Sequence, residues 1–366
     1  MKFKISREAL LKPLQVVSGV VEKRQTLPIL SNVLVNIESD RLTLTGTDLE
    51  VELTASTQLD GAEGGEVTLP ARKFMDICKS LPEEAELTIT IDDQRALIRS
   101  GKSRFNLSTL SAHDFPATEK VTGAREYTVS QSVLKHLIEQ TQFCMANQDV
   151  RYYLNGLLLE LRSNALRAVA TDGHRLAMCD MQSEIIPGDI SQIIVPRKGV
   201  VELSRLLSDS DTPCTIQLNS NHIRIDLGDI IFLSKLIDGR FPDYDRVIPK
   251  GGDKIVIANR EVLRQGLLRA SILSNEKYRG IRMNFSNGLL RATVNNPDQE
   301  EAEEEIDINY QGDELEIGFN VSYLVDALNA IKQDEVQLTL IDPNSSCLIS
   351  GIGDDSSRYV VMPMRL

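Results

Sequence analysis

The sequence predicts an α+β fold of three similar domains in tandem, each with two helices on antiparallel sheets. The chain has 366 residues, more than one ordinary hydrophobic core accommodates. A short strand followed by an amphipathic helix opens three segments, at Lys2, Glu126 and Lys254, and a second strand-to-helix pattern recurs about 65 residues further into each. Similarity at a regular period indicates repeated structural units. We expect domains at 1–122, 123–252 and 253–366.

The first pattern reads KFKISREALLKPLQVV, EYTVSQSVLKHLIEQT and KIVIANREVLRQGLLRA in the three segments. Each copy starts with alternating apolar and polar residues, which is typical of a strand. Helix N-caps are then expected at Ser6, Ser130 and Asn259. Apolar residues at helical spacing follow, and they predict helices over 6–18, 130–144 and 259–273.

The second pattern reads EVTLPARKFMDICKSL, QIIVPRKGVVELSRLL and EIGFNVSYLVDALNAI, with Pro70, Pro196 and Asn320 in equivalent places. It predicts shorter helices over 71–80, 197–207 and 321–332. Strand-like pairs such as NVLVNIES with DRLTLTGT surround the helices. The dipeptides Phe115-Pro116 and Phe241-Pro242 close the first two segments, and VTGAR and IPKGGDK are the expected linkers.

Composition indicates a cytoplasmic protein without cofactor or metal. No apolar run approaches the roughly 18 residues that a membrane span needs, and the N-terminus lacks the apolar core of a signal peptide. The five cysteines are scattered and never form a CxxC pair, so we expect free thiols rather than disulfides or a zinc site.

Charge is distributed unevenly along the chain. The net charge is −13, which taken whole argues against a nucleic-acid ligand. The six predicted helices nevertheless hold thirteen basic and six acidic residues, while the remainder holds 27 basic and 47 acidic. Helix propensity alone would give a modest basic bias, but glutamate is also a good helix former and is scarce on these helices. If all six helices share one side of the sheets, that side is positive and suits sequence-independent contact with duplex DNA.

The sequence shows no catalytic signature. Asp172 and His174 could suggest a small hydrolase, but no nucleophile, metal set or GxxxxGK[ST] phosphate loop accompanies them. His174 is therefore expected in the wall of a binding pocket. The absence of Trp and the low aromatic content argue against stacking on single-stranded nucleic acid.

The chain carries the motifs TLPILSNVLV, GTDLE, LPARKF, SRFNLSTL, QDVRYYLNG, ATDGHRLA, IVPRKGV, DGRFPDY, LSNEKYRG, NNPDQEEAEE, GFNVSYL and YVVMPMRL. These motifs resemble those of the bacterial sliding clamps, the beta subunits of DNA polymerase III, and the resemblance extends from Met1 to Leu366. It implies a head-to-tail homodimer whose six domains form a closed ring, with helices lining the hole and sheets outside. It also implies a processivity factor without catalytic activity.

In this family a pocket between the second and third domains binds partner peptides. By resemblance the pocket comprises Leu154, Thr171, Gly173, His174, Arg175, Leu176, Pro242, Arg246, Val247, Val360, Met362, Pro363 and Met364, with Asn320 and Tyr323 at its edge. Leu, Val, Pro and Met would form an apolar trough, in which methionine adapts to varied ligands. Arg175 and Arg246 are expected to hold a polar or acidic peptide group. The alternative is that VVMPM is only a last buried strand.

The resemblance also assigns DNA contacts and a subunit interface. The DNA-binding candidates are Arg24, Gln148, Tyr152 and Tyr153, and the helix charges add Arg72, Lys73, Arg197, Lys198 and Arg205. The interface candidates are Lys73, Lys102, Arg104, Phe105, Leu107, Ile272, Leu273, Asp298, Glu300, Glu301 and Glu304, with Glu303 in the same acidic run. Lys73 belongs to both sets. An acidic run is more commonly a solvated face, and that interpretation stays open.

The expected partners are duplex DNA, a second copy of the chain, the DNA polymerase III alpha subunit, the clamp-loader ATPase complex, and other polymerases and repair proteins that use the peptide pocket. No membrane partner is expected. The main rival interpretation is a protein-binding scaffold without DNA. The contrast between basic helices and an acidic remainder argues against it.

Overall fold

The computed structural model describes residues 1–22, 27–92, 94–116, 121–183 and 191–365. Arg24, a predicted DNA contact, lies outside these residues.

The chain forms two compact units. The first unit contains residues 1–132 and 198–236, and the second contains 133–197 and 237–366. The predicted domain boundaries stay predictions, because the strands of consecutive repeats join in common sheets.

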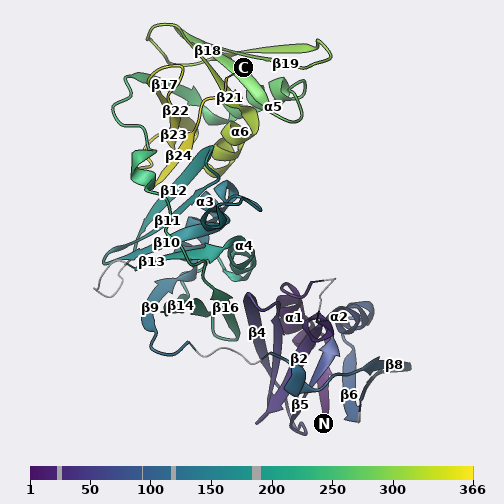
Figure 1. The fold of residues 1–366 in the computed structure, drawn as a ribbon. Coiled ribbons are helices and arrows are strands. Elements are labelled where there is room, and N and C mark those ends of the chain that lie inside the picture. Colours follow the sequence, from purple (N-terminus) through teal and green to yellow (C-terminus); the bar gives the residue numbers. More distant parts are fainter. Residues whose placement is uncertain (23–26, 93, 117–120, 184–190, 366) are drawn as a thin grey trace. The chain divides into compact units, whose positions relative to one another are not determined.

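Each of three consecutive repeats contains eight described strands and two α-helices (Figure 1). The first repeat contains β1 Lys2–Ser6, α1 Arg7–Ser18, η1 Pro28–Ser31, β2 Asn32–Glu38, β3 Arg41–Thr47, β4 Val51–Gln58, β5 Gly65–Pro70, α2 Ala71–Ser80, β6 Glu86–Asp92, β7 Arg95–Ser100, β8 Ser103–Ser108 and η2 Ala112–Asp114. The second contains β9 Arg125–Ser130, α3 Gln131–Thr141, η3 Gln142–Cys144, η4 Tyr152–Leu154, β10 Gly156–Arg162, β11 Ala165–Thr171, β12 Arg175–Gln182, β13 Ser191–Pro196, α4 Arg197–Leu206, β14 Pro213–Leu218, β15 His222–Asp226, β16 Ile230–Lys235 and η5 Tyr244–Arg246. The third contains β17 Lys254–Asn259, α5 Arg260–Ser271, β18 Gly280–Ser286, β19 Leu289–Asn295, β20 Glu301–Asp307, β21 Leu315–Asn320, α6 Val321–Ala330, β22 Glu335–Leu340, β23 Cys347–Gly351 and β24 Ser357–Val361.

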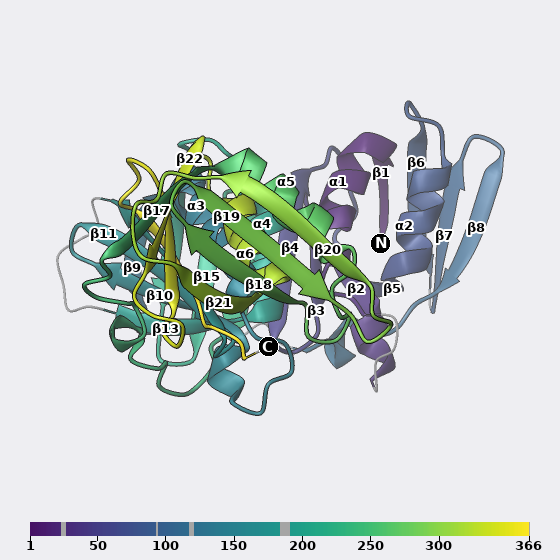
Figure 2. The same cartoon turned by 90° about the horizontal axis from the view of Figure 1, so that it is seen from above.

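Every repeat builds two four-stranded antiparallel sheets in the same order. In the first repeat these are β5-β2-β3-β4 and β1-β6-β7-β8, and the other two repeats follow the same plan. Figure 2 shows α1 and α2 side by side, and both pack on the sheet that contains β2 to β5. In the third repeat α5 and α6 pack together in the same way on the sheet of β18 to β21. The predicted fold class and the threefold repeat are therefore confirmed.

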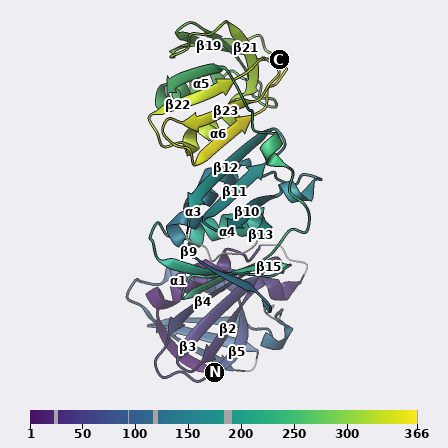
Figure 3. The same ribbon diagram turned by 90° about the vertical axis from the view of Figure 1, so that its left-hand side faces the viewer.

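Two eight-stranded sheets arise where a sheet of one repeat continues into a sheet of the next. At the first junction β4 pairs with β16, so that β2, β3 and β4 continue into β16, β15, β14 and β9 (Figure 3). At the second junction β12 pairs with β24 (Figure 1). The strands β8 and β20 are the equivalents of β16 and β4, and each has one side without a partner strand in the part of the chain that is described.

The helix starts were predicted to within a residue because their signals are local. Ser6 and Asn259 lie just before their helices and accept hydrogen bonds from the backbone N–H groups of Ala9 and Val262. The cap at Ser130 stays a prediction. The first residue of each of these helices donates its backbone N–H to a carbonyl oxygen in the loop after the second helix of the same repeat. The pairs are Arg7 with Ala85, Gln131 with Thr212 and Arg260 with Asp334.

The helix ends were predicted less well. Ile331 has an extended backbone with ψ of 135°, so α6 ends at Ala330 and Lys332 lies beyond it. The six observed helices therefore hold twelve basic and six acidic residues. Some of the arginines serve the fold, since Arg7 and Arg260 donate to carbonyl oxygens near the C-terminal ends of α2 and α6.

All five cysteines are free and buried. None of the described helices is long and apolar enough to span a membrane. The described residues also contain no group of three or more His, Cys, Asp or Glu side chains that could hold a metal ion.

Candidate peptide-binding pocket

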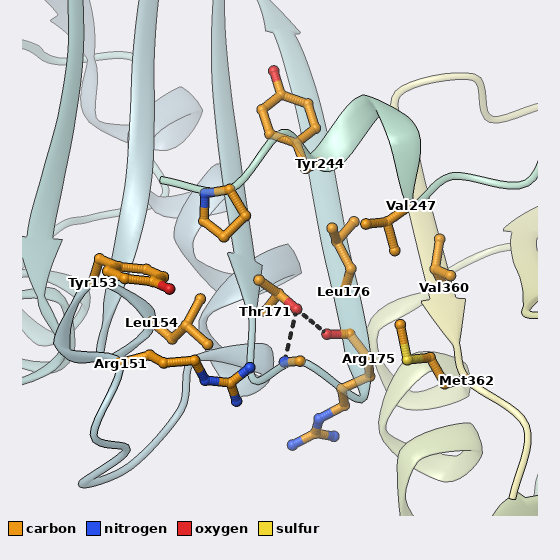
Figure 4. A pocket seen from close by; sticks show the side chains of 12 residues that line it. Arg151, Tyr153, Leu154, Thr171, Arg175, Leu176, Tyr244, Val247, Val360 and Met362 are labelled. Carbon is orange, nitrogen blue, oxygen red and sulfur yellow. Dashed lines mark hydrogen bonds between the residues drawn. The ribbon is translucent and has the colours of Figure 1, made fainter. Parts of the chain in front are cut away.

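A tight hairpin between β11 and β12 forms the base of a pocket in the second unit. The Thr171 hydroxyl donates to the backbone oxygen of Arg175 at 2.6 Å and accepts from the N–H of Gly173 at 3.1 Å. Both bonds are drawn in Figure 4. Gly173 has φ of +89°, a left-handed conformation that glycine adopts without strain. A short hydroxyl side chain and a glycine two residues later thus determine the shape of the turn.

The hairpin is tied to the end of the last strand. The Asp172 carboxylate accepts from the backbone N–H groups of His174 and Arg175 at 2.9 and 3.0 Å. Beyond β24, the N–H of Met362 donates to the His174 oxygen at 2.9 Å. These bonds place the end of β24 beside residues of the second repeat.

The pocket is a cavity of about 150 Å³ between the hairpin, the end of β24 and the segment after β16 (Figure 4). Its lining consists of Arg151, Tyr153, Leu154, Thr171, Gly173, Arg175, Leu176, Pro242, Tyr244, Val247, Val360 and Met362. Nine of these belong to the predicted peptide pocket. Beneath it lies a buried cluster that includes Leu158, Val169 and Phe241. A mostly apolar, concave site on a preformed framework is typical of ligand pockets.

Arg175 is committed to the protein itself, which changes the expectation that it holds a peptide group. Its guanidinium donates to Asp172, to Asp326 on α6 and to the backbone oxygen of Phe143. It also lies over the Tyr323 ring, 4.4 Å from the ring centre. Only 13% of the side chain is exposed. Arg175 therefore fixes α6 against the hairpin, while Arg246, 85% exposed and paired with Asp243, stays open to a ligand.

The other predicted pocket residues lie around the cavity rather than on its wall. His174 is exposed at the tip of the hairpin, and Tyr323 lies under Arg175. The Asn320 side chain accepts from the N–H of Ser322 at the start of α6. Met364 borders a separate cavity on the third repeat, together with Tyr278 and Arg282. Pro363 is half-buried between Met362 and Met364.

Arg151 and Tyr244 line the pocket without having been predicted there, and Tyr153 had been assigned to DNA. Arg151 donates two side-chain bonds and its backbone N–H to Asp149, and these hydrogen bonds lower the pKa of Asp149 to about 2. Its guanidinium fills the space beside Gly173, where a Cβ would approach it within 2.9 Å. The QDVRYYLNG motif contains both Arg151 and Tyr153, but the spacing of its residues does not show which of them face the cavity.

The first junction repeats the hairpin with different chemistry. The Thr47 hydroxyl bonds the Val51 oxygen and the Leu49 N–H, and the N–H of Lys235 donates to the Glu50 oxygen. Thr171 and Met362 form the equivalent hydrogen bonds at the second junction. A smaller cavity of about 90 Å³ lies there. In equivalent positions it carries Glu52 for Leu176 and Lys235 for Met362, so the apolar character belongs to the second junction.

The predicted DNA contacts lie on helices and loops of both units. Arg72 and Lys73 are exposed on α2, while Gln148 and Tyr152 are exposed on the loop before β10. Three cations of α4 already have partners: Arg197 donates to the Met145 oxygen, Lys198 pairs with Glu22 and Asp48, and Arg205 pairs with Glu202.

The predicted interface residues lie on two open strand edges and near the end of α5. Lys102 and Arg104 are exposed at β8, where Phe105 is half-buried and Leu107 is buried. Ile272 is 76% exposed after α5 and Leu273 is half-buried. Asp298, Glu300, Glu301 and Glu303 are exposed at or before β20. Glu304 already forms a two-bond ion pair with Arg269.

Comparison with known proteins covers the whole chain. Three sequence models match in order: the DNA polymerase III beta subunit N-terminal domain at residues 1–119, its central domain at 128–243 and its C-terminal domain at 245–365. The chain is 58% identical to the beta sliding clamp of Pseudomonas putida over the full length of both proteins. It is also similar to the crystal structure of the DNA polymerase III beta subunit from Pseudomonas aeruginosa, with a TM-score of 0.97, 57% identity and full coverage of both chains. Another solved sliding clamp from Pseudomonas aeruginosa, equally similar, is bound to griselimycin.

Proposed function

Because the chain belongs to the bacterial DNA polymerase III beta-subunit family, the sliding clamps, we propose that two copies close head-to-tail into a ring around duplex DNA. The ring tethers the replicative polymerase and other DNA-processing proteins to the template. It confers processivity without performing a chemical step, and a cytoplasmic location follows from this role.

The repetition of the sheet junctions is the observation that carries the ring proposal. The paired strands of the three repeats align residue by residue from the equivalent helix starts. This makes Phe105 equivalent to Phe232 and Tyr359, and Ala302 equivalent to Leu53 and Ala177. Both junctions use one register: Phe232 lies opposite Leu53, and Tyr359 lies opposite Ala177. A third junction between β8 of one copy and β20 of another completes the series.

The same register assigns the residue pairs at the third junction. With Phe105 opposite Ala302 of the other copy, Arg104 lies opposite Glu303 and Lys102 opposite Glu305. Opposite charges at directly paired positions of neighbouring strands stabilise a sheet. Two such junctions related by a twofold axis close the assembly and leave neither β8 nor β20 as an open edge. This register supports placing the acidic run at the proposed interface rather than on a solvated face.

Reversing the charge of one partner tests this register. We expect Arg104→Glu alone and Glu303→Arg alone to raise the dimer dissociation constant, by about tenfold to a hundredfold. Each change places like charges opposite one another at both junctions, and each cross-strand pair contributes roughly 0.2–1 kcal/mol. The double variant should restore dimerisation towards the unmodified level in sedimentation velocity. Additive weakening in the double variant would mean that the two residues do not face each other.

Weak DNA contact is consistent with sliding. The helices contribute exposed cations such as Arg72, Lys73 and Lys12, while the net charge of the chain is −13. Attraction between cations and the phosphate backbone does not depend on sequence, so the ring has no preferred stopping point. The candidates for direct contact are Arg24, Gln148, Tyr152 and Tyr153, with Arg72, Lys73, Arg197, Lys198 and Arg205 on the helices.

The apolar pocket is the proposed attachment point for partner peptides. Its lining of Leu, Val, Pro and Met side chains suits short segments with an apolar anchor, and Arg246 is available to a polar group at the rim. Partners would include the DNA polymerase III alpha subunit, the clamp-loader ATPase complex, and other polymerases and repair proteins. Attachment to the ring keeps a polymerase at high effective concentration near its template.

Retention on circular DNA distinguishes a ring from a DNA-free scaffold. We expect the protein, loaded onto a nicked circular plasmid by a clamp loader, to co-elute with the DNA in gel filtration. Cutting the same circle once should release it, because topological linkage ends when the duplex has free ends. Replacing Arg72 and Lys73 by alanine should shorten retention at low salt, and the difference from the unmodified protein should shrink as the salt concentration rises. A protein that stays on linear DNA equally long, or never associates with the circle, would refute the proposal.

A further inference from the structure

A buried polar network lies behind the pocket, and Tyr244 is its one member that lines the cavity in the described part of the chain. Glu160 on β10 is only 1% exposed. Its carboxylate accepts hydrogen bonds from the Tyr244 hydroxyl at 3.0 Å, from Arg162 at 2.5 Å and from Gln192 at 2.6 Å. A buried carboxylate is costly unless it is fully paired, so each of these donors matters.

Tyr244 connects this carboxylate to a second ion pair. Arg167 on β11 donates to the Tyr244 oxygen at 3.1 Å and forms two bonds with Asp180 on β12, at 2.6 and 2.8 Å. The hydroxyl thus donates to Glu160 and accepts from Arg167. Burial raises the pKa of Tyr244, so the hydroxyl keeps its proton near neutral pH. The network spans four strands of one sheet, from Gln192 on β13 to Asp180 on β12.

The ring of Tyr244 belongs to the pocket. It lines the cavity and packs in the same buried cluster as Phe241, and in Figure 4 its hydroxyl points away from the cavity. Tyr244 opens η5, within the irregular segment that also carries Pro242 and Val247 of the pocket wall. In the described part of the chain, the backbone N–H groups of this wall bond locally, Arg246 to the Asp243 oxygen and Val247 to the Tyr244 oxygen. Its position on the sheet therefore depends strongly on side chains.

We propose that Tyr244 is a positioning residue for ligand binding, and that its hydrogen bonds to Glu160 and Arg167 hold the wall of Pro242 and Val247 open before a ligand arrives. This inference rests on the proposed role of the pocket. If the wall moves, Glu160 and Arg167 lose a partner in a place that water reaches poorly, and that loss is costly. The network thus favours one position of the wall. If the wall is displaced in some molecules, the measured association constant equals the intrinsic constant multiplied by the fraction of molecules that remain competent to bind.

The test uses the full-length protein and griselimycin, the ligand present in a solved clamp of the family. We expect Tyr244→Phe, which keeps the ring and removes the hydroxyl, to weaken griselimycin binding about tenfold in calorimetry. Glu160→Gln should weaken it similarly, and the double variant should be little worse than either single one, because the two residues act through one bond. The matched control is Tyr310→Phe. It removes another buried hydroxyl, bonded to the Asp313 oxygen, but lies outside the pocket lining and should not change affinity.

A second measurement separates positioning from general destabilisation. In Tyr244→Phe the amide hydrogens of Arg246 and Val247 should exchange faster than in the unmodified protein, whereas the sedimentation of the dimer stays unchanged. Unchanged affinity in Tyr244→Phe, or equal loss in Tyr310→Phe, would overturn the positioning role and leave the pocket itself intact. Failure of the unmodified protein to bind griselimycin would overturn both the pocket and this inference, while retention on circular DNA would still test the ring independently.

Discussion

Replacing both Ile272 and Leu273 by alanine is expected to convert the dimer into monomers. Ile272 is 76% exposed in the single chain and Leu273 is half-buried, so neither residue is a main element of the subunit core. At the proposed interface they would pack near Phe105 of the other copy. Burying one such side chain contributes roughly 1.5–3 kcal/mol. A closed ring has two interfaces and loses four side chains, on the order of 6 kcal/mol, or about four orders of magnitude in dissociation constant.

Sedimentation velocity at micromolar concentration measures this effect. The variant should sediment as a monomer. Its thermal unfolding temperature should fall only by the amount that dimerisation contributes in the unmodified protein. Val262→Ala is the matched control, because Val262 is also an exposed apolar residue of α5, 53% exposed, at the opposite end of the helix. That variant should remain dimeric. If the double variant forms a dimer of unchanged stability, Ile272 and Leu273 do not lie at the interface.

The helices could be predicted from the sequence because their signals are local. Ser6 and Asn259 cap their helices as expected, and the apolar spacing gave every helix start to within one residue. The errors lie at the C-terminal ends. The sequence predicts Lys332 on the last helix, but that helix ends at Ala330 because the backbone of Ile331 is extended. No glycine or proline marks this end in the sequence.

The junctions between repeats could not be predicted, because they depend on pairing between distant strands. Nothing in the residues of β4 indicates that its partner is β16, about 180 positions later in the chain. A register of this kind is determined by which faces are buried in the whole sheet. The register of the two junctions is visible only in the structure, and the proposed pairing of Arg104 with Glu303 of the other copy rests on it.

The pocket shows the same division between local and distant signals. Its hairpin, from Thr171 to Arg175, was found through a motif that is continuous in sequence. Tyr244 was missed because its importance comes from hydrogen bonds to Glu160 and Arg167, 84 and 77 residues away. Arg175 was predicted to hold a ligand, since sequence does not reveal that Asp326, 151 residues later, already pairs with it.

Placing a carboxylate in the pocket wall is expected to abolish ligand binding while leaving the ring assembled. Met362→Asp changes a side chain that is 38% exposed, and the backbone bond from its N–H to the His174 oxygen remains available. In the free protein the new carboxylate stays in contact with water. A bound apolar side chain would exclude that water, and an unpaired charge buried in this way costs several kcal/mol. We expect griselimycin affinity to fall at least a hundredfold, equivalent to about 2.7 kcal/mol.

The internal repeat supplies the control for this variant. Lys235 occupies the position equivalent to Met362 at the first junction, where its N–H donates to the Glu50 oxygen. Lys235→Asp changes the net charge by more than Met362→Asp does, in the same local backbone geometry. If binding requires the apolar wall of the second junction, only Met362→Asp loses affinity in calorimetry, and both variants sediment as dimers. Equal losses in the two variants would mean that overall charge governs binding, and full affinity in Met362→Asp would place the ligand elsewhere on the protein.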